Sequence, residues 1–157
     1  MEVVVRQAEK ADTGAVSELW KELMDYHAAI DPVFTRDPQG HVAFELWLLD
    51  RIEDANMLLL LAEVDGEPAG FCQAEITDYP PVLMIAQFGM ILNFTVTKSH
   101  RRKGIGRAMV QKTLEWMRSR DIGRIELCAA TGNEISNPFW QDMGFAPYKT
   151  SYYLNLK

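Results

Sequence analysis

The chain has few residues that could build a metal centre or a disulfide framework. It contains only two cysteines and three histidines among 157 residues. No Cys-x-x-Cys pair occurs, and the histidines do not stand at metal-ligand spacing. Cys72 and Cys128 each lie in an apolar run, where a free cysteine usually behaves as a small buried hydrophobe. The sequence therefore predicts no metal site and two reduced, buried cysteines.

Long apolar segments are also absent. The longest apolar run, Met57 to Ala62, is six residues, whereas a membrane-spanning helix needs about 20. The first residues, Met1 to Arg6, lack the apolar core of a signal peptide. We therefore expect a cytoplasmic protein with no membrane association.

Positive charge is scarce in the first part of the chain. Residues 1–90 hold 17 Asp and Glu but only five Lys and Arg. Residues 91–157 hold five Asp and Glu and 11 Lys and Arg. The net charges of these parts are −12 and +6, and the total of −6 argues against a general nucleic-acid binder. No linker or internal repeat divides the chain, and its length suits one domain. We expect a single domain over residues 1–157, with an acidic half and a basic half.

Hydrophobic periodicity predicts a mixed α/β domain. Strands are expected at residues 3–5, 57–64, 69–76, 88–96, 124–130, 145–148 and 152–156. Helices are expected at residues 13–28, 40–52, 104–120 and 134–142. Asp12 is a candidate N-cap for the first helix and Gly123 a candidate C-cap for the third. Asp65-Gly66 supplies the positive φ of a tight hairpin turn.

A basic turn with two glycines joins the strand ending at Val96 to the helix that follows. Such a turn leaves backbone N–H groups unpaired at the positive end of a helix, which favours an anion. Its glycines let a phosphate approach the backbone, and its cations are Arg101, Arg102, Lys103 and Arg107. A merely solvated loop is the alternative. The turn matches neither the P-loop pattern nor the dinucleotide pattern, because Met109 stands where a third glycine belongs.

Two motifs resemble a known family. Arg101-x-x-Gly104-x-Gly106 resembles the pyrophosphate motif of the GNAT superfamily of acyl-CoA-dependent N-acyltransferases. The stretch Asn133-x-x-Ser136-x-x-Phe139-Trp140-x-x-Met143-Gly144-Phe145 is similar to the second motif of that family. The element order fits nearly the whole chain. The resemblance implies a mixed, mostly antiparallel twisted sheet of about six to seven strands flanked by four helices.

The resemblance also implies acetyl-CoA as co-substrate, with no metal. The pyrophosphate would bind the amides of the turn formed by Arg101, Arg102, Lys103, Gly104, Ile105 and Gly106, with Arg107 close by. The pantetheine would pair with the backbone of Phe94, Thr95 and Val96 and would bind Asn133. Phe139 and Trp140 would pack near the thiol, and a plain core role stays open for both.

The resemblance implies direct attack of an amine on the thioester, for which orientation supplies much of the rate. The sequence departs from the family at both acid/base positions. Trp140 stands where a tyrosine often protonates the thiolate, and the strand Gly89–Phe94 carries no carboxylate. Asn93 could orient the amine, Glu75 could act as base and Tyr148 as acid. Surface or packing roles stay open for these three, as they do for the weaker candidates Asp78, His27, Tyr152 and Tyr153.

The expected acceptor is a small-molecule or peptide amine, and no nucleic acid or membrane partner is expected. A cationic acceptor is favoured because the acidic half would flank the acceptor cleft of this fold. A homodimer is left open. Two alternative functions remain: a catalytically silent acyl-CoA-binding sensor or partner module, and a nucleotide-binding regulator that uses the same turn.

Overall fold

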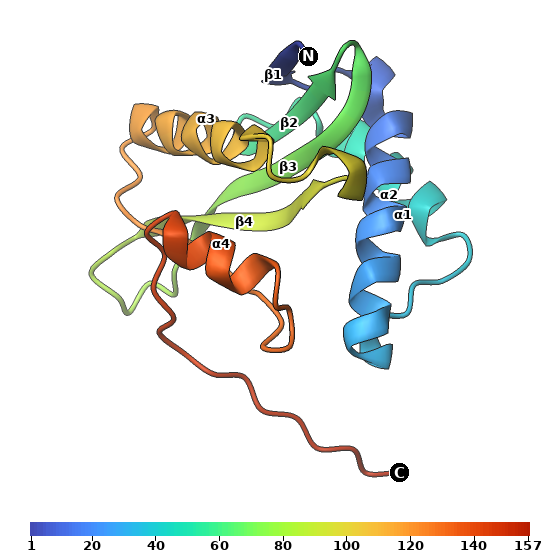
Figure 1. The fold of residues 1–157 in the computed structure, drawn as a ribbon. Coiled ribbons are helices and arrows are strands. Elements are labelled where there is room, and N and C mark those ends of the chain that lie inside the picture. Colours follow the sequence, from blue (N-terminus) through green and yellow to red (C-terminus); the bar gives the residue numbers. More distant parts are fainter.

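Five strands form one sheet in the order β1-β2-β3-β4-β5 (Figure 1). The computed structural model describes all 157 residues. The first three pairings are antiparallel, and only β4 and β5 run parallel. The strands are β1 (Val3–Gln7), β2 (Met57–Val64), β3 (Glu67–Asp78), β4 (Gln87–Val96) and β5 (Ile125–Leu127). The expected mixed, mostly antiparallel sheet is confirmed.

Four helices cover the two faces of this sheet. Figure 1 shows one pair on one side of the sheet and the other pair on the opposite side. The first pair is α1 (Thr13–Ile30) and α2 (Gly40–Arg51), and the second is α3 (Ile105–Ser119) and α4 (Ser136–Asp142). Each pair closes a separate hydrophobic core. On β3, Phe71 belongs to the core under α1 and α2, whereas its neighbour Cys72 belongs to the core under α3.

Strand β2 explains the apolar run seen in the sequence. Leu58 and Leu60 point into the core under α3, and Leu59 and Leu61 point into the core under α1 and α2. A strand that is covered on both faces needs no polar alternation. Its hairpin to β3 turns at Asp65-Gly66, whose φ angles of 51° and 84° confirm the expected tight turn.

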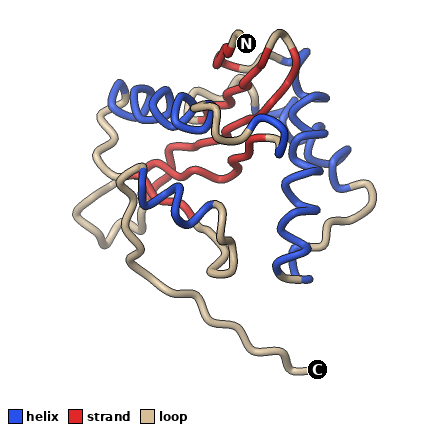
Figure 2. The backbone as a smooth tube through the Cα atoms, viewed as in Figure 1, coloured by secondary structure: helices blue, strands red, loops and turns tan.

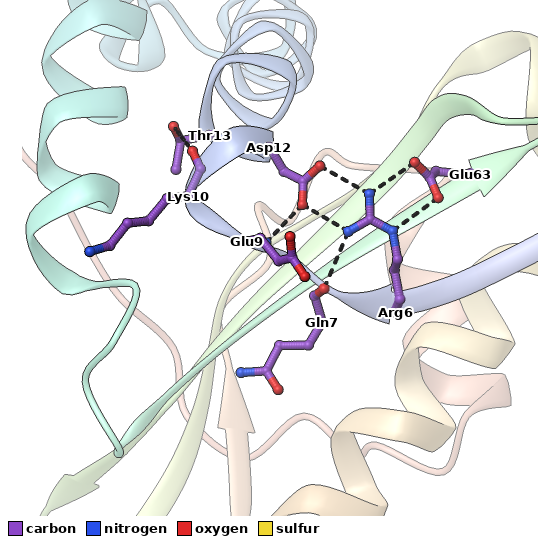
Figure 3. Close-up of polar contacts among 7 residues, drawn as sticks. All are labelled: Arg6, Gln7, Glu9, Lys10, Asp12, Thr13 and Glu63. Carbon is purple, nitrogen blue, oxygen red and sulfur yellow. Dashed lines mark hydrogen bonds and ion pairs between the residues drawn. The ribbon is translucent and has the colours of Figure 1, made fainter.

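Arg6 on β1 ties the start of α1 to the sheet (Figure 3). Its Nη1 lies 2.8 Å from Oδ2 of Asp12, and its Nη2 lies 3.0 Å from Oε1 of Glu63 on β2. Hydrogen bonds with these carboxylates raise the pKa of Arg6, and the bond to Arg6 lowers the pKa of Asp12. Asp12 also accepts the N–H of Glu9 at 2.7 Å. Asp12 is the N-cap residue of α1, as expected, but its side chain makes no capping hydrogen bond, because its oxygens are used by Arg6 and by the short turn before the helix.

The two strands expected at residues 145–148 and 152–156 do not form. Beyond α4 the chain leaves the body of the molecule as an extended segment without secondary structure (Figures 1 and 2). Its tyrosines and leucines have the composition of a strand, but strand preference reflects packing on a half-buried sheet. Residues 146–157 are all exposed, and Tyr152 is 92% exposed. The sheet therefore has five strands rather than six or seven, and β5 has three residues rather than seven.

Two further expectations are corrected. Helix α3 ends before Asp121, which takes the left-handed conformation (φ 58°) expected of Gly123. Cys72 is buried, and burial raises the pKa of its thiol to about 12. Cys128 is exposed, because β5 ends one residue before it. None of the four α-helices combines the length and the hydropathy that a bilayer span requires.

Candidate functional site

The turn before α3 presents a row of free backbone donors. A short 3-10 turn (Lys98–His100) leads into it, and Arg102 and Gly104 both take left-handed conformations, with φ 61° and 80°. None of the seven N–H groups from Arg101 to Arg107 donates a hydrogen bond within the chain. They lie at the positive end of a 15-residue helix. This geometry is that of an anion-binding backbone nest.

The four cations of this turn differ in their freedom. Arg101 donates from Nε to the carbonyl of Val96 at 3.0 Å, and Arg107 pairs with Asp142 on α4 at 2.8 Å. Arg102 and Lys103 are exposed and form no ion pair. Arg101 and Arg107 therefore hold the turn and α4 in place, while Arg102 and Lys103 carry the positive charge that faces solvent.

Strand β4 has an unpaired outer edge next to this turn. Its pairing with β5 stops at Ile91, opposite Leu127. Beyond that point Phe94, Thr95 and Val96 have a neighbour only on the β3 side, and the Val96 carbonyl accepts from Arg101. An extended ligand with amide groups could add here like a strand.

Asn133 organises the segment that enters α4. Its Oδ1 accepts the N–H of Ser136 at 2.9 Å and the N–H of Ile135 at 3.2 Å. The same oxygen accepts from the hydroxyl of Tyr26 on α1 at 3.3 Å. The Asn133 side chain is buried, and its amide nitrogen makes no hydrogen bond within the chain. That nitrogen is the one donor of Asn133 still available to a ligand.

An aromatic cluster fills the space between β4 and α4. Phe94 lies 5.6 Å from Phe139 and 4.8 Å from Trp140, measured between ring centroids. A Cβ on Gly106 would come within 3.2 Å of the Phe139 ring, so only glycine leaves room for that ring without displacement. The core role left open for Phe139 and Trp140 is therefore present, directly behind the free edge of β4.

The opposite face of β4 carries polar groups from two strands. Asn93 donates from Nδ2 to Oε1 of Gln73 at 2.7 Å, which leaves its own Oδ1 without a partner. Glu75 lies two residues further along β3 on the same face, about 7 Å away along the strand. Its Oε1 is buried and lies 3.1 Å from Nη2 of Arg51, but the two form no hydrogen bond of good geometry. The structure thus places Asn93 and Glu75 on one face of the sheet.

A groove next to Asn93 was not foreseen from the sequence. It has a volume of about 300 Å³ and is lined by Trp20, Phe44, Trp47, Gln73, Leu92 and Asn93. A bulge in β4 opposite Gln73 and Ala74 leaves Leu92 without a partner on β3. The Leu92 side chain is 46% exposed. The helical spacing of the aromatic residues indicated a core face, and only the tertiary structure shows that this face is partly open.

Tyr148 is not brought to the same place. Its hydroxyl donates to Oε1 of Glu126 on β5, which also lies 3.2 Å from Nη2 of Arg124. The bond from Tyr148 is the main reason why the pKa of Glu126 lies below its usual range. Glu126 pairs with Met90, three positions before Asn93 on β4. The Tyr148 hydroxyl is therefore occupied at the paired end of β4 and β5.

The weaker candidates make local contacts or lie exposed. His27 bonds through Nδ1 to the carbonyl of Leu23 at 2.8 Å and packs edge-on against Phe34. Asp78 accepts from Gln87 at 2.9 Å. Tyr152 and Tyr153 lie exposed in the C-terminal segment. No group of three or more His, Cys, Asp or Glu side chains is arranged to hold a metal ion.

Comparison with known proteins agrees with this arrangement. The model of the Acetyltransferase (GNAT) family matches residues 14–145. An uncharacterised N-acetyltransferase of Archaeoglobus fulgidus is 29% identical over 136 residues, which cover 87% of this chain and 88% of that protein.

Two solved structures show the same fold at 18% identity. A predicted acetyltransferase from Clostridium acetobutylicum, solved with acetyl-CoA, superposes with a TM-score of 0.80 over 99% of this chain and 97% of its own. An aminoglycoside 6'-N-acetyltransferase from Acinetobacter haemolyticus superposes with a TM-score of 0.77 over 98% of each chain. The family match spans both motifs, the turn before α3 and the segment into α4. The chain therefore belongs to the GNAT family of acetyltransferases.

Proposed function

We propose that the protein transfers an acetyl group from acetyl-CoA to a primary amine, by direct attack within a ternary complex. The observation that carries this proposal is the row of seven free N–H groups from Arg101 to Arg107, which lies beside the unpaired edge of β4. One part suits a diphosphate and the other suits an extended chain with amide groups. Membership of the GNAT family and a structural neighbour solved with acetyl-CoA support the same substrate.

The residues of this chain fit acetyl-CoA at three places. The N–H groups from Arg101 to Gly106 would hold the pyrophosphate, with Arg102 and Lys103 supplying charge. The edge of β4 from Phe94 to Val96 would pair with the pantetheine, and the free Nδ2 of Asn133 would donate to it. Since backbone groups make most of these contacts, binding depends little on the identity of individual side chains.

The opposite face of β4 would receive the acceptor. A primary amine is protonated in neutral solution and must lose a proton before it attacks the thioester. Asn93 offers Oδ1 as a hydrogen-bond acceptor for the amine, and Glu75, whose Oε1 is buried beside Arg51, offers its other carboxylate oxygen as base. The net charge of −12 in residues 1–90 would attract a cationic acceptor.

Departure of the thiolate needs less help from the protein. A thiol has a pKa of about 8.5, so its anion is a tolerable leaving group at neutral pH. Trp140 cannot act as an acid, and Tyr148 would first have to give up its bond to Glu126. Orientation of the amine and the thioester is therefore the main contribution that we assign to the protein.

The test is acetyl transfer by the full chain. Purified protein is incubated with acetyl-CoA and a panel of amines, and the release of CoA thiol is followed together with the mass of the acetylated amine. We expect turnover with at least one amine, and a lower kcat/KM in Asn93→Ala. Binding of CoA without turnover of any amine would overturn the proposal in favour of a silent binding module. Equal displacement of bound CoA by ATP would instead favour a nucleotide-binding regulator.

A further inference from the structure

We infer that the acceptor amine is attached to a flat, uncharged body, an aryl or arylalkyl group, which lies in the groove formed by Trp20, Phe44, Trp47 and Leu92. This inference rests on the proposed function, because it identifies the acceptor of that reaction.

The walls of the groove are flat and preformed. The rings of Trp20 and Phe44 stack at 5.0 Å with an interplanar angle of 22°, and those of Phe44 and Trp47 stack at 6.1 Å and 15°. Gly40 packs closely against the Trp20 ring, since a Cβ on Gly40 would lie 3.3 Å from that ring. Aromatic rings that line a groove favour an aromatic ligand, because aromatic pairs pack well in both offset-stacked and edge-to-face arrangements.

The open side of the groove is apolar as well. Leu92 is 46% exposed and Trp47 is 38% exposed. The two residues come from different elements, β4 and α2, and both line the same groove. Apolar side chains that converge on a concave site next to a few polar groups are typical of small-ligand pockets.

The charge around the groove disfavours an acceptor with several cations. None of the six lining residues is charged. The carboxylate of Glu75, on the same sheet face as Asn93, already faces Arg51 at 3.1 Å, and Arg51 itself lies over the Trp47 ring at 5.0 Å. A polyamine or an aminoglycoside would bring ammonium groups beyond the reacting amine into a groove with no charged lining residue, beside the cation of Arg51. Such groups would lose hydration without compensation.

The polar end of the groove is the place where the amine would sit. Asn93 lines the groove, and its neighbour Phe94 points to the other face of the sheet, where it contacts Phe139 and Trp140. Pairing between β4 and β5 ends at Ile91, so the sheet is open beside these two residues. An aryl group stacked on the rings would leave its amine at Asn93, beside the opening that leads to the edge of β4.

The inference is tested by comparing amines at a fixed concentration of acetyl-CoA. The panel contains 2-phenylethylamine, a straight-chain alkylamine, the triamine spermidine and an aminoglycoside. We expect kcat/KM for 2-phenylethylamine to exceed that for spermidine and for the aminoglycoside by at least about tenfold, which is the discrimination expected of an apolar pocket. A higher kcat/KM for spermidine or for the aminoglycoside would overturn the inference and leave the proposed function standing.

Two variants locate the selectivity in the groove. Trp47→Ser should raise the KM for 2-phenylethylamine about tenfold with little change in kcat or in the KM for acetyl-CoA, because it removes binding that is uniform along the reaction. Leu46→Ser is the matched control, since Leu46 precedes Trp47 on α2, is 64% exposed and does not line the groove. An equal rise in KM in both variants would overturn the assignment of the groove.

A binding measurement separates this inference from the proposed function. Calorimetric titration of 2-phenylethylamine is carried out in the presence of CoA with the wild-type chain and with Trp47→Ser. Binding to the wild-type chain that is lost in Trp47→Ser supports the assignment of the groove. If such binding is seen but no amine is acetylated, only the proposed function fails. No binding to the wild-type chain would overturn the inference, even if another amine is acetylated.

Discussion

The hydroxyl of Tyr26 donates a hydrogen bond to Oδ1 of Asn133 across 3.3 Å, although the two residues are 107 positions apart in the sequence. The Tyr26 ring also lies under the guanidinium of Arg101, 5.5 Å from ring centroid to Cζ. One residue of α1 therefore contacts both motifs on the proposed acetyl-CoA side, while Trp20 of the same helix lines the groove on the other face. Helix α1 links the two halves of the site.

Tyr26→Phe should remove the hydrogen bond between α1 and Asn133 without creating a cavity. The substitution keeps the ring beneath Arg101 and removes the bond to a buried side chain, which costs about 1 kcal/mol of unfolding free energy. If the lost hydrogen bond also reduces the free energy of acetyl-CoA binding, the KM for acetyl-CoA rises by up to roughly fivefold. Chemical denaturation and steady-state kinetics measure both effects. Tyr153→Phe, in the exposed C-terminal segment, is the control, and identical behaviour of the two variants would contradict the prediction.

Arg102→Gly should separate the contribution of the backbone amides to CoA binding from that of the side-chain charge in the anion-binding turn. Arg102 has φ 61°, a left-handed conformation that costs a non-glycine residue about 1 kcal/mol. We expect the variant to be more stable by roughly that amount and to lose less than about tenfold in CoA affinity, since one exposed cation is lost while the amides remain. Lys103→Gly removes the neighbouring cation without relieving strain and should not gain stability. Thermal unfolding and calorimetric titration with CoA test the comparison.

The features that the sequence predicted well are those set by local chemistry. Asp65-Gly66 determines its turn by backbone preference alone, and the apolar stripe from Ile105 to Met117 determines the buried face of α3. The free amides after Arg101 follow from the chain path at the start of a helix. None of these requires knowledge of what lies elsewhere in the chain.

The features that were missed depend on distant partners. Asp12 is a residue type that favours an N-cap, but Arg6 on β1, which also pairs with Glu63 on β2, takes up its oxygens. The aromatic spacing on α1 and α2 is the same for a closed core and for an open groove, and the bulge at Leu92 decides between them. Tyr26 carries no local signal for its contact with Asn133.

Gly106→Ala should show how tightly α3 and α4 are packed at the site. Alanine favours a helix by about 1 kcal/mol over glycine, but its Cβ would lie 3.2 Å from the Phe139 ring. We expect little net change in the wild-type background and a gain approaching about 1 kcal/mol in a Phe139→Leu background, where the ring is gone. A double-mutant cycle measured by denaturant unfolding gives the coupling. Equal effects of the alanine in both backgrounds would show that Phe139 moves aside freely.

Asp12→Asn should reveal the contribution of the Arg6 pair to stability. The bond from Arg6 holds the pKa of Asp12 below its usual value, so the stabilisation is present above the unfolded pKa of about 3.9 and is lost as the pH falls through the lower, folded value. Since the Arg6 side chain is 36% exposed, solvent screening limits the effect at pH 7 to about 1 kcal/mol. Unfolding measured from pH 7 to pH 2.5 should show the two proteins converging in acid. A gap that stays constant with pH would contradict the assignment.

Tyr148→Phe distinguishes a structural role of this hydroxyl from a catalytic one. The hydroxyl donates to Glu126 and lowers the pKa of that carboxyl, so its removal should raise the pKa and reduce stability at neutral pH. The loss should shrink in acid, where Glu126 becomes protonated in both proteins. Loss of a general acid would lower kcat by about 100-fold or more. We expect instead a change of less than about twofold, because a thiolate is a sufficient leaving group without a proton donor. The variant's kcat with the best amine of the panel, measured between pH 6 and 9, decides between these two roles.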